Sequence, residues 1–257
     1  MVIIVRMQNK TTNKNVRWWL LGFGLFVILT TLFYAFSYVI WYDAKDELNK
    51  TGAPTQFAVF KGWGSFLYYT YLSNFLLGFA LIIASILWTN MHAKKALFIS
   101  VVSITMTFVV YWALLSYQKS TWTSPLNATR SLITHAINPI LGFVALSLIK
   151  KEIIVTKLTF TIPVLISTVY TIFAMILFFA TFDKIIPSRG AVVYGFLDFK
   201  NPYFYKGNNT GVIVILDFLL YAVSIITPLL FGIMWKFIYK IKYQKSIPKK
   251  TKIIAEQ

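Results

Sequence analysis

Residues 158–182 have the sequence LTFTIPVLISTVYTIFAMILFFATF, in which 25 consecutive positions carry no charged side chain. A helix needs about 20 such residues to cross the hydrocarbon core of a bilayer, because each residue adds about 1.5 Å of rise. Five further stretches are long and apolar enough by the same measure: 18–41, 66–89, 96–117, 131–149 and 212–239. We therefore predict an all-α integral membrane protein that forms a bundle of six transmembrane helices.

The composition of the chain supports this class. Of the 257 residues, 58% are hydrophobic and 13% are charged, and the mean hydropathy is +0.67. A soluble domain has too little interior to bury so much apolar surface. The net charge of +17 comes from basic residues between the apolar stretches and at the C-terminus, so we expect membrane lipids as partners and no nucleic acid. With no cysteine and two histidines the chain has too few soft ligands for a zinc site, and we expect no metal and no cofactor.

The distribution of the 25 Lys and Arg residues predicts which side of the membrane each loop occupies. Sixteen lie in four segments that would share one side: 1–17, 90–95, 150–157 and the chain from residue 236 onward. Nine lie in the loops that alternate with them: 42–65, 118–130 and 183–211. Because basic residues near helix ends resist translocation, we predict that both termini are cytoplasmic. Residues 1–17 and 240–257 would then be basic tails around a six-helix membrane domain over 18–239.

The C-terminal tail is strongly basic. We expect it to attract anionic lipid of the inner leaflet, at about 1 kcal/mol per basic residue near the surface, with a ribosome or another acidic partner as the alternative. Its lysines are Lys240, Lys242, Lys245, Lys249, Lys250 and Lys252.

Polar residues within the apolar stretches are the candidate functional residues, because each costs free energy in hydrocarbon. Thr70, His135 and Asp217 each lie roughly five residues into a helix predicted to run inward, which puts them at one level about 6–8 Å below the outer boundary. One turn deeper is a second polar layer that comprises Asn74, Asn138 and Tyr221. We therefore predict a two-layer polar cluster among the second, fourth and sixth helices, in a pocket that opens outward.

Two short strings in these helices resemble a known family. The string Tyr68-Tyr69-Thr70-Tyr71-Leu72-Ser73-Asn74, followed two helices later by Arg130-Ser131-Leu132-Ile133-Thr134-His135, resembles the androgen-induced and androgen-dependent six-helix membrane hydrolases and their prokaryotic six-helix relatives. The segment Tyr194-Gly195-Phe196-Leu197-Asp198 also resembles a Tyr-Pro-Phe-Leu-Asp pattern of the prokaryotic relatives, with glycine in place of proline. The resemblance implies a multi-pass protein of a bacterial plasma membrane.

The same resemblance implies a chemistry. In the mammalian members a threonine and a histidine on separate helices cleave fatty acid esters of hydroxy fatty acids, and these two residues correspond to Thr70 and His135. A threonine hydroxyl is a weak nucleophile until a base takes its proton, and neutral imidazole suits that task near pH 7. We expect a lipid ester as the substrate of this catalytic pair.

Other residues of the cluster have expected roles beside the pair. On depth alone, Asp217 is the candidate to orient the imidazole ring. Side-chain donors for an oxyanion would come from Asn74, Asn138 or Ser73, with Tyr221 beside them. Arg130 would hold a lipid carboxylate or phosphate at the interface.

Each of these side chains also has a structural interpretation. A threonine in a membrane helix commonly bonds to its own backbone, a buried histidine can bridge two helices, and Asp217 could pair with Arg130 or relay protons. The alternative function is therefore a non-enzymatic protein that binds or transports a small solute or protons through the same cluster. No inverted repeat is visible in the sequence to support transport.

Three prolines lie inside the predicted helices, at positions 139, 163 and 228. Proline has no backbone N–H, so each leaves a carbonyl of the preceding turn without its helical partner. We expect neighbouring groups to satisfy these carbonyls.

Overall fold

The computed structural model describes residues 2–49, 51–117 and 119–245. Within them, six helical stretches are long and apolar enough to cross a membrane: Lys14–Ile40, Gln56–Ile86, Met91–Leu115, Pro125–Glu152, Lys157–Thr181 and Thr210–Ile238. These bounds confirm the six predicted helices to within a few residues at most ends. The main differences are that the second stretch starts earlier and that the first helix extends well into the predicted N-terminal tail.

The helices have the following bounds. Three of the long ones are continuous: α1 (Val2–Ile40), α8 (Lys157–Thr181) and α9 (Thr210–Ile238). The other three stretches are built from α2 (Gln56–Phe60), η2 (Lys61–Leu67) and α3 (Tyr69–Ile86); from α4 (Met91–Val110) and η3 (Tyr111–Leu115); and from α6 (Pro125–Leu132), η4 (Ile133–Ile137), α7 (Asn138–Ile149) and η5 (Lys150–Glu152). Short helical turns in the loops are η1 (Ala44–Glu47), α5 (Lys119–Trp122), η6 (Gly195–Leu197) and η7 (Pro202–Phe204). Both η3 and η4 are π-helical turns.

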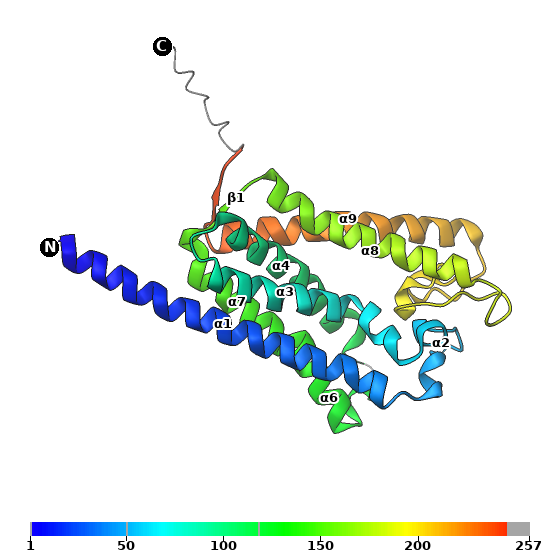
Figure 1. Ribbon diagram of the computed structural model, residues 1–257. Coiled ribbons are helices and arrows are strands. Elements are labelled where there is room, and N and C mark those ends of the chain that lie inside the picture. The colour runs from blue at the N-terminus through cyan, green and yellow to red at the C-terminus, as the bar shows by residue number, and fades with distance from the viewer. Residues whose placement is uncertain (1, 50, 118, 246–257) are drawn as a thin grey trace, which may run out of the picture.

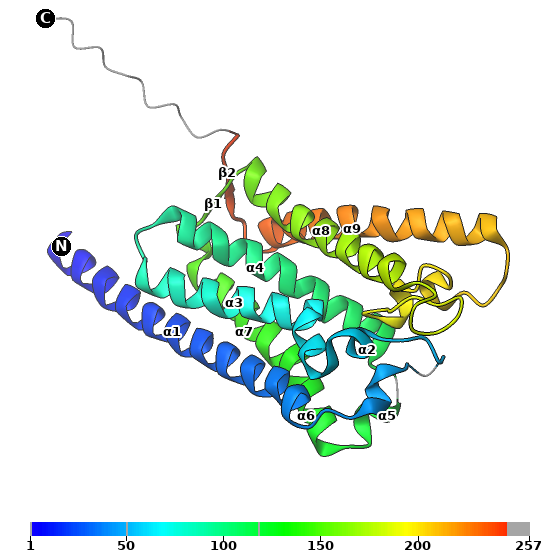
Figure 2. The same cartoon turned by 45° about the vertical axis from the view of Figure 1, so that its right-hand side comes forward.

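Helix α4 lies at the centre of the bundle and contacts α3, α7, α8 and α9. On one side α1 packs along α3, and on the other α8 packs along α9, as Figures 1 and 2 show. The main apolar core therefore gathers side chains from α1, α3, α4 and α7, with Leu20, Leu77, Leu97 and Leu146 all fully buried. This leaves the α8–α9 pair in contact with the rest mainly through α4.

The two ends of the bundle differ. At the end where α1 begins, strand β1 (Ile154–Val155) pairs in parallel with β2 (Lys242–Tyr243), and we call this the strand end (Figure 1). The opposite loop end holds residues 41–49, 51–68, 116–117, 119–124 and 182–209. There the last long loop is tied to the first, because the N–H of Val192 donates to Pro54 O at 2.9 Å and the N–H of Gln56 donates to Val192 O at 3.1 Å. At the strand end, the first residues of the predicted C-terminal tail lie in the small sheet formed by β1 and β2. Residues 246–257 of this tail lie outside the described residues.

Helices α1 and α3 approach closely at Gly24. A Cβ atom at this position would lie 2.7 Å from Ile82 Cγ1 and 3.0 Å from the Gly78 carbonyl oxygen, whereas one at the exposed Gly22 would meet nothing within 4 Å. We expect Gly24→Ala to lower the free energy of unfolding by about 1–3 kcal/mol through overpacking. Gly22→Ala should be neutral or stabilising, because alanine favours a helix. Thermal unfolding of both purified variants checks this, and equal midpoints would contradict the close packing.

Candidate functional site

The structure brings Thr70 and His135 into contact. Thr70 lies in the first turn of α3 and His135 in the π-helical turn η4, and Thr70 Oγ1 is 3.2 Å from His135 Nε2. This distance is within the range for proton transfer between a hydroxyl and an imidazole. The side chain of Thr70 is 9% exposed, so the contact is shielded from bulk solvent.

The other ring nitrogen of His135 determines which tautomer faces the hydroxyl. His135 Nδ1 lies 3.1 Å from the carbonyl oxygen of Ser131 and 3.0 Å from Thr134 Oγ1. A carbonyl oxygen only accepts, and the Thr134 hydroxyl already donates to Arg130 O at 2.8 Å. In the neutral ring Nδ1 therefore carries the proton, and the lone pair of Nε2 is directed at Thr70, as a general base requires.

The π-helical turn around His135 follows from Pro139. Because Pro139 has no N–H, it cannot donate to His135 O, four residues before it, or to Thr134 O, five residues before it. Both carbonyls accept hydrogen bonds from side chains of other helices instead. Asn74 Nδ2 donates to Thr134 O at 3.1 Å, and Trp112 Nε1 donates to His135 O at 3.0 Å. This confirms at Pro139 the expectation that neighbours satisfy the freed carbonyls. The ring of Tyr111 stacks on the imidazole, with centroids 3.7 Å apart.

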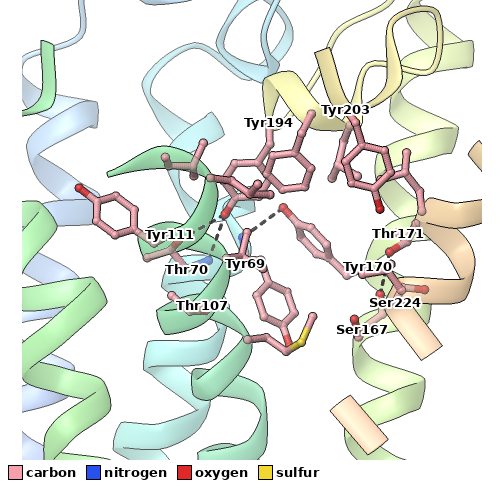
Figure 3. Close-up of a pocket in the computed structure, with 18 of the residues that line it drawn as sticks. Tyr69, Thr70, Thr107, Tyr111, Ser167, Tyr170, Thr171, Tyr194, Tyr203 and Ser224 are labelled. Carbon is pink, nitrogen blue, oxygen red and sulfur yellow. Dashed lines mark hydrogen bonds between the residues drawn. The ribbon is translucent and has the colours of Figure 1, made fainter. Parts of the chain in front are cut away.

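Two phenol groups cap the start of α3, as the close-up in Figure 3 shows. The N–H of Tyr69 donates to Tyr170 Oη at 3.1 Å, and the N–H of Thr70 donates to Tyr194 Oη at 3.3 Å. These are N–H groups of the first helical turn, which have no partner within the helix. Thr70 consequently sits at the positive end of the helix dipole, which favours negative charge on its oxygen.

Tyr194 also contacts the hydroxyl of Thr70, at 3.3 Å. If the Thr70 hydroxyl donates to His135, the Tyr194 hydroxyl is left to donate to Thr70 Oγ1. Burial raises the pKa of the Tyr194 phenol above its ordinary value of 10.0, and hydrogen bonds with Thr70 offset part of that rise. The phenol therefore stays protonated at neutral pH. Tyr194 belongs to the segment that resembles the prokaryotic relatives, but nothing in the sequence indicates its contact with Thr70, and no sequence pattern indicates a role for Tyr170.

Thr70 and His135 lie between two cavities. An apolar cavity of about 120 Å³ lies among α4, α8 and α9, and its walls include Met106, Val110 and Leu220. A polar cavity of about 580 Å³ lies at the loop end. Its polar wall includes Asp46, Thr55, Thr121, Asn127 and Arg130. Both cavities are lined by Thr70, Tyr111, Leu115, His135 and Tyr194. A molecule that reaches the pair can therefore have an apolar part on one side and a polar part on the other.

The three predicted oxyanion donors have structural partners. Asn74 Nδ2 donates to Thr70 O at 2.7 Å as well as to Thr134 O, and Asn138 Nδ2 donates to Asn74 Oδ1 at 2.7 Å. Ser73 Oγ is 2.6 Å from Thr107 Oγ1. All three residues are buried, and none of them lines either cavity. They hold α3 against α4 and η4, which corrects the expectation that they face a substrate.

Asp217 and Tyr221 also differ from expectation. Asp217 lies on α9 but lines neither cavity, and the position next to His135 Nδ1 is taken by Ser131 O and Thr134 Oγ1. Within the described residues its Oδ1 has no hydrogen-bond partner, and it forms no ion pair with Arg130. Tyr221 Oη contacts Met175 Sδ at 2.5 Å, away from both cavities. Neither residue therefore completes the site, although both share its predicted depth.

Arg130, the residue predicted to hold a lipid carboxylate or phosphate, lies in the wall of the polar cavity. Its guanidinium stacks over the ring of Tyr38 at 4.1 Å from the centroid and donates to Ser37 Oγ at 3.3 Å. Within the described residues no carboxylate lies close enough to form an ion pair with it. Burial and the charge of Asp43 raise the pKa of Asp46 in the same cavity, and the charge of Arg130 lowers it.

The fold and the site define a multi-pass helical membrane protein with a buried threonine–histidine pair. Comparisons of the chain with protein-family models, curated proteins and solved structures find no match.

Proposed function

We propose that this protein hydrolyses a lipid ester, with Thr70 as the nucleophile and His135 as the general base. The observation that carries the proposal is the 3.2 Å contact between Thr70 Oγ1 and His135 Nε2 at the junction of an apolar and a polar cavity. The resemblance to the six-helix fatty-ester hydrolases independently assigns the same two residues. The orientation with cytoplasmic termini and the bacterial plasma membrane are part of the proposal, with the loop end outside.

The reaction proceeds in two steps. Thr70 Oγ1 attacks the ester carbonyl carbon while its proton passes to His135 Nε2, and the oxyanion forms near the positive end of α3. The C–O bond to the alcohol breaks, and His135 returns the proton to the departing oxygen. Water from the polar cavity then attacks the acyl carbon while His135 Nε2 takes one of its protons. The bond between the acyl carbon and Thr70 Oγ1 breaks, His135 returns the proton to Thr70 Oγ1, and the fatty acid leaves. The Tyr194 hydroxyl donates toward the reacting oxygen, because it remains protonated.

The two cavities divide the substrate between them. The acyl chain lies against Met106, Val110 and Leu220, where burial of each CH₂ group stabilises the complex by about 0.8 kcal/mol. The alcohol part lies in the polar cavity, where Arg130 pairs with a carboxylate or phosphate. An ester whose alcohol carries an anionic group fits both sides.

The alternative function, binding or transport of a small solute or protons, has weaker support. Binding or proton transport of this kind would use Asp217 as a titratable group, but Asp217 lines neither cavity. A proton relay through Thr70 and His135 would need a further group in contact with them that ionises near neutral pH. The Tyr194 phenol contacts Thr70 but stays protonated at neutral pH, and the hydrogen-bond contacts of the imidazole are Ser131 O, the Thr134 hydroxyl and Thr70.

A covalent probe tests the proposed function. Purified protein would be incubated with a fluorophosphonate that carries an alkyl chain and, in parallel, with fatty acid esters of hydroxy fatty acids. We expect ester turnover and a single adduct, which mass spectrometry of the digested protein would locate on Thr70. Thr70→Ser should keep both signals, since a serine hydroxyl can replace that of threonine. An adduct on a residue other than Thr70 would contradict the assignment. So would ester turnover by protein that has been incubated with a saturating amount of the probe and carries no label on Thr70.

A further inference from the structure

A third cavity lies at the strand end, far along α4 and α8 from the threonine–histidine pair. It has a volume of about 400 Å³ and lies between the first turns of these two helices. Basic side chains dominate its polar wall: His92, Lys95, Lys157 and Lys245. This cavity shares no lining residue with the two cavities of the candidate site.

Among the residues that the structure describes, no acidic side chain pairs with the three lysines of this cavity. The ion pairs found in the described residues involve Lys45, Lys61 and Lys94, and no Asp or Glu lines the cavity. Three ammonium groups around one space repel each other unless an anion lies between them. The first turns of α4 and α8 add the positive ends of two helix dipoles at the same place.

Backbone pairing fixes Lys245 beside this cavity. The residue follows β2, whose pairing with β1 is extended by a hydrogen bond from the N–H of Gln244 to Val155 O at 2.9 Å. Since Val155 precedes Lys157 by two residues, the small sheet holds the end of the described chain next to the start of α8. The cavity is therefore built from three separate parts of the sequence and is more than a solvated basic helix face.

The remaining wall is apolar and continues onto the outer surface of the bundle. Ile99 and Ile162 lie deeper along α4 and α8, and Leu158 is 63% exposed. In a six-helix membrane protein, such a surface faces acyl chains. The lysines lie at the opening of the cavity and the apolar wall lies below them, which fits a ligand with an anionic head and hydrocarbon tails. A soluble anion would contact the lysines but leave the apolar wall without a partner.

We propose that this cavity binds the headgroup of an anionic phospholipid, with Lys95, Lys157 and Lys245 around the phosphate and the acyl chains along Ile99 and Ile162. The proposal does not depend on the proposed hydrolysis. It also differs from general attraction of the basic tail to the membrane, because it names one bounded site.

Lipid titration of the full-length protein tests this site. Purified protein in detergent would be titrated with short-chain phosphatidylglycerol, with phosphatidylcholine as the uncharged comparison, and bound copies counted by native mass spectrometry. We expect one tightly retained phosphatidylglycerol, and binding about 100-fold weaker in the variant Lys95→Gln/Lys157→Gln/Lys245→Gln, since each lysine near an anionic lipid contributes about 1 kcal/mol. Each single variant should show a smaller loss in the same direction, which covers the case that the triple variant does not fold.

A charge-matched variant separates the site from overall charge. Lys14→Gln/Lys150→Gln/Lys151→Gln removes three charges from the same end but none from the cavity or from the C-terminal tail. It should retain the lipid as the wild type does, and an equal loss in both triple variants would overturn the proposal. Inorganic phosphate forms the third arm. If it displaced phosphatidylglycerol at similar concentrations, the site would be one for free phosphate and the lipid assignment would be wrong.

Discussion

Thr70→Val and His135→Gln are each expected to lower the rate of ester hydrolysis about 10³-fold. The variant with both substitutions should lose little more than either single variant. The reason is that the two groups act as one unit. Without the imidazole, the hydroxyl keeps its proton, and without the hydroxyl, the imidazole has no nucleophile to activate. The measurement is the initial rate of fatty ester hydrolysis by equal amounts of folded protein, with unfolding midpoints recorded for each variant.

The control for this experiment is Thr161→Val. Thr161 lies on α8 and donates to Lys157 O of its own helix at 3.2 Å, and it lines none of the three cavities. Its rate should equal that of the wild type. Losses that multiplied in the Thr70/His135 double variant would show that the two residues contribute separately, and the proposed proton transfer between them would be wrong.

Asn74→Ala is expected to cost about 2–4 kcal/mol in the free energy of unfolding, the largest stability effect among the substitutions considered. Asn74 is fully buried and joins α3 to the His135 turn, since its amide donates to Thr70 O and Thr134 O while its Oδ1 accepts from Asn138. The substitution leaves Thr134 O and the Asn138 amide in a water-poor interior with fewer partners. Thermal unfolding in detergent measures the effect.

Asn127→Ala is the matched comparison for Asn74→Ala. Asn127 is half-buried in the wall of the large polar cavity, where solvent can replace its side chain. Its removal should change the free energy of unfolding by less than about 0.5 kcal/mol. If the two asparagine variants unfolded at the same temperature, the network around Asn74 would not be a stabilising element.

Sequence reasoning predicted the helices well, because a run of about 20 apolar residues has few alternatives to a membrane-spanning helix. It also placed Thr70 and His135 at one level by counting along their helices, and the two side chains do meet. Counting of this kind gives the depth of a residue but not the direction in which it points around the helix axis. Asp217 has the matching predicted depth, yet it lines neither of the two cavities beside the pair.

Other parts of the site depend on contacts that no local pattern encodes. Pro139 was visible in the sequence, but the donors to the carbonyls it frees, Asn74 and Trp112, come from two other helices. Tyr194 reaches Thr70 from a long loop that has no helical periodicity. The grouping of Lys245 with Lys95 and Lys157 likewise follows from the pairing of β1 with β2 and not from sequence spacing.

The capping of α3 by Tyr170 and Tyr194 has a consequence for biosynthesis. A ribosome makes Thr70 and His135 well before either tyrosine, so a nascent chain that has inserted only four helices holds the pair without its phenol partners. The hydrogen bonds at the start of α3 are completed only when the fifth helix and the loop after it have emerged. Truncated translation products that stop before residue 170 should therefore insert into the membrane without acquiring esterase activity.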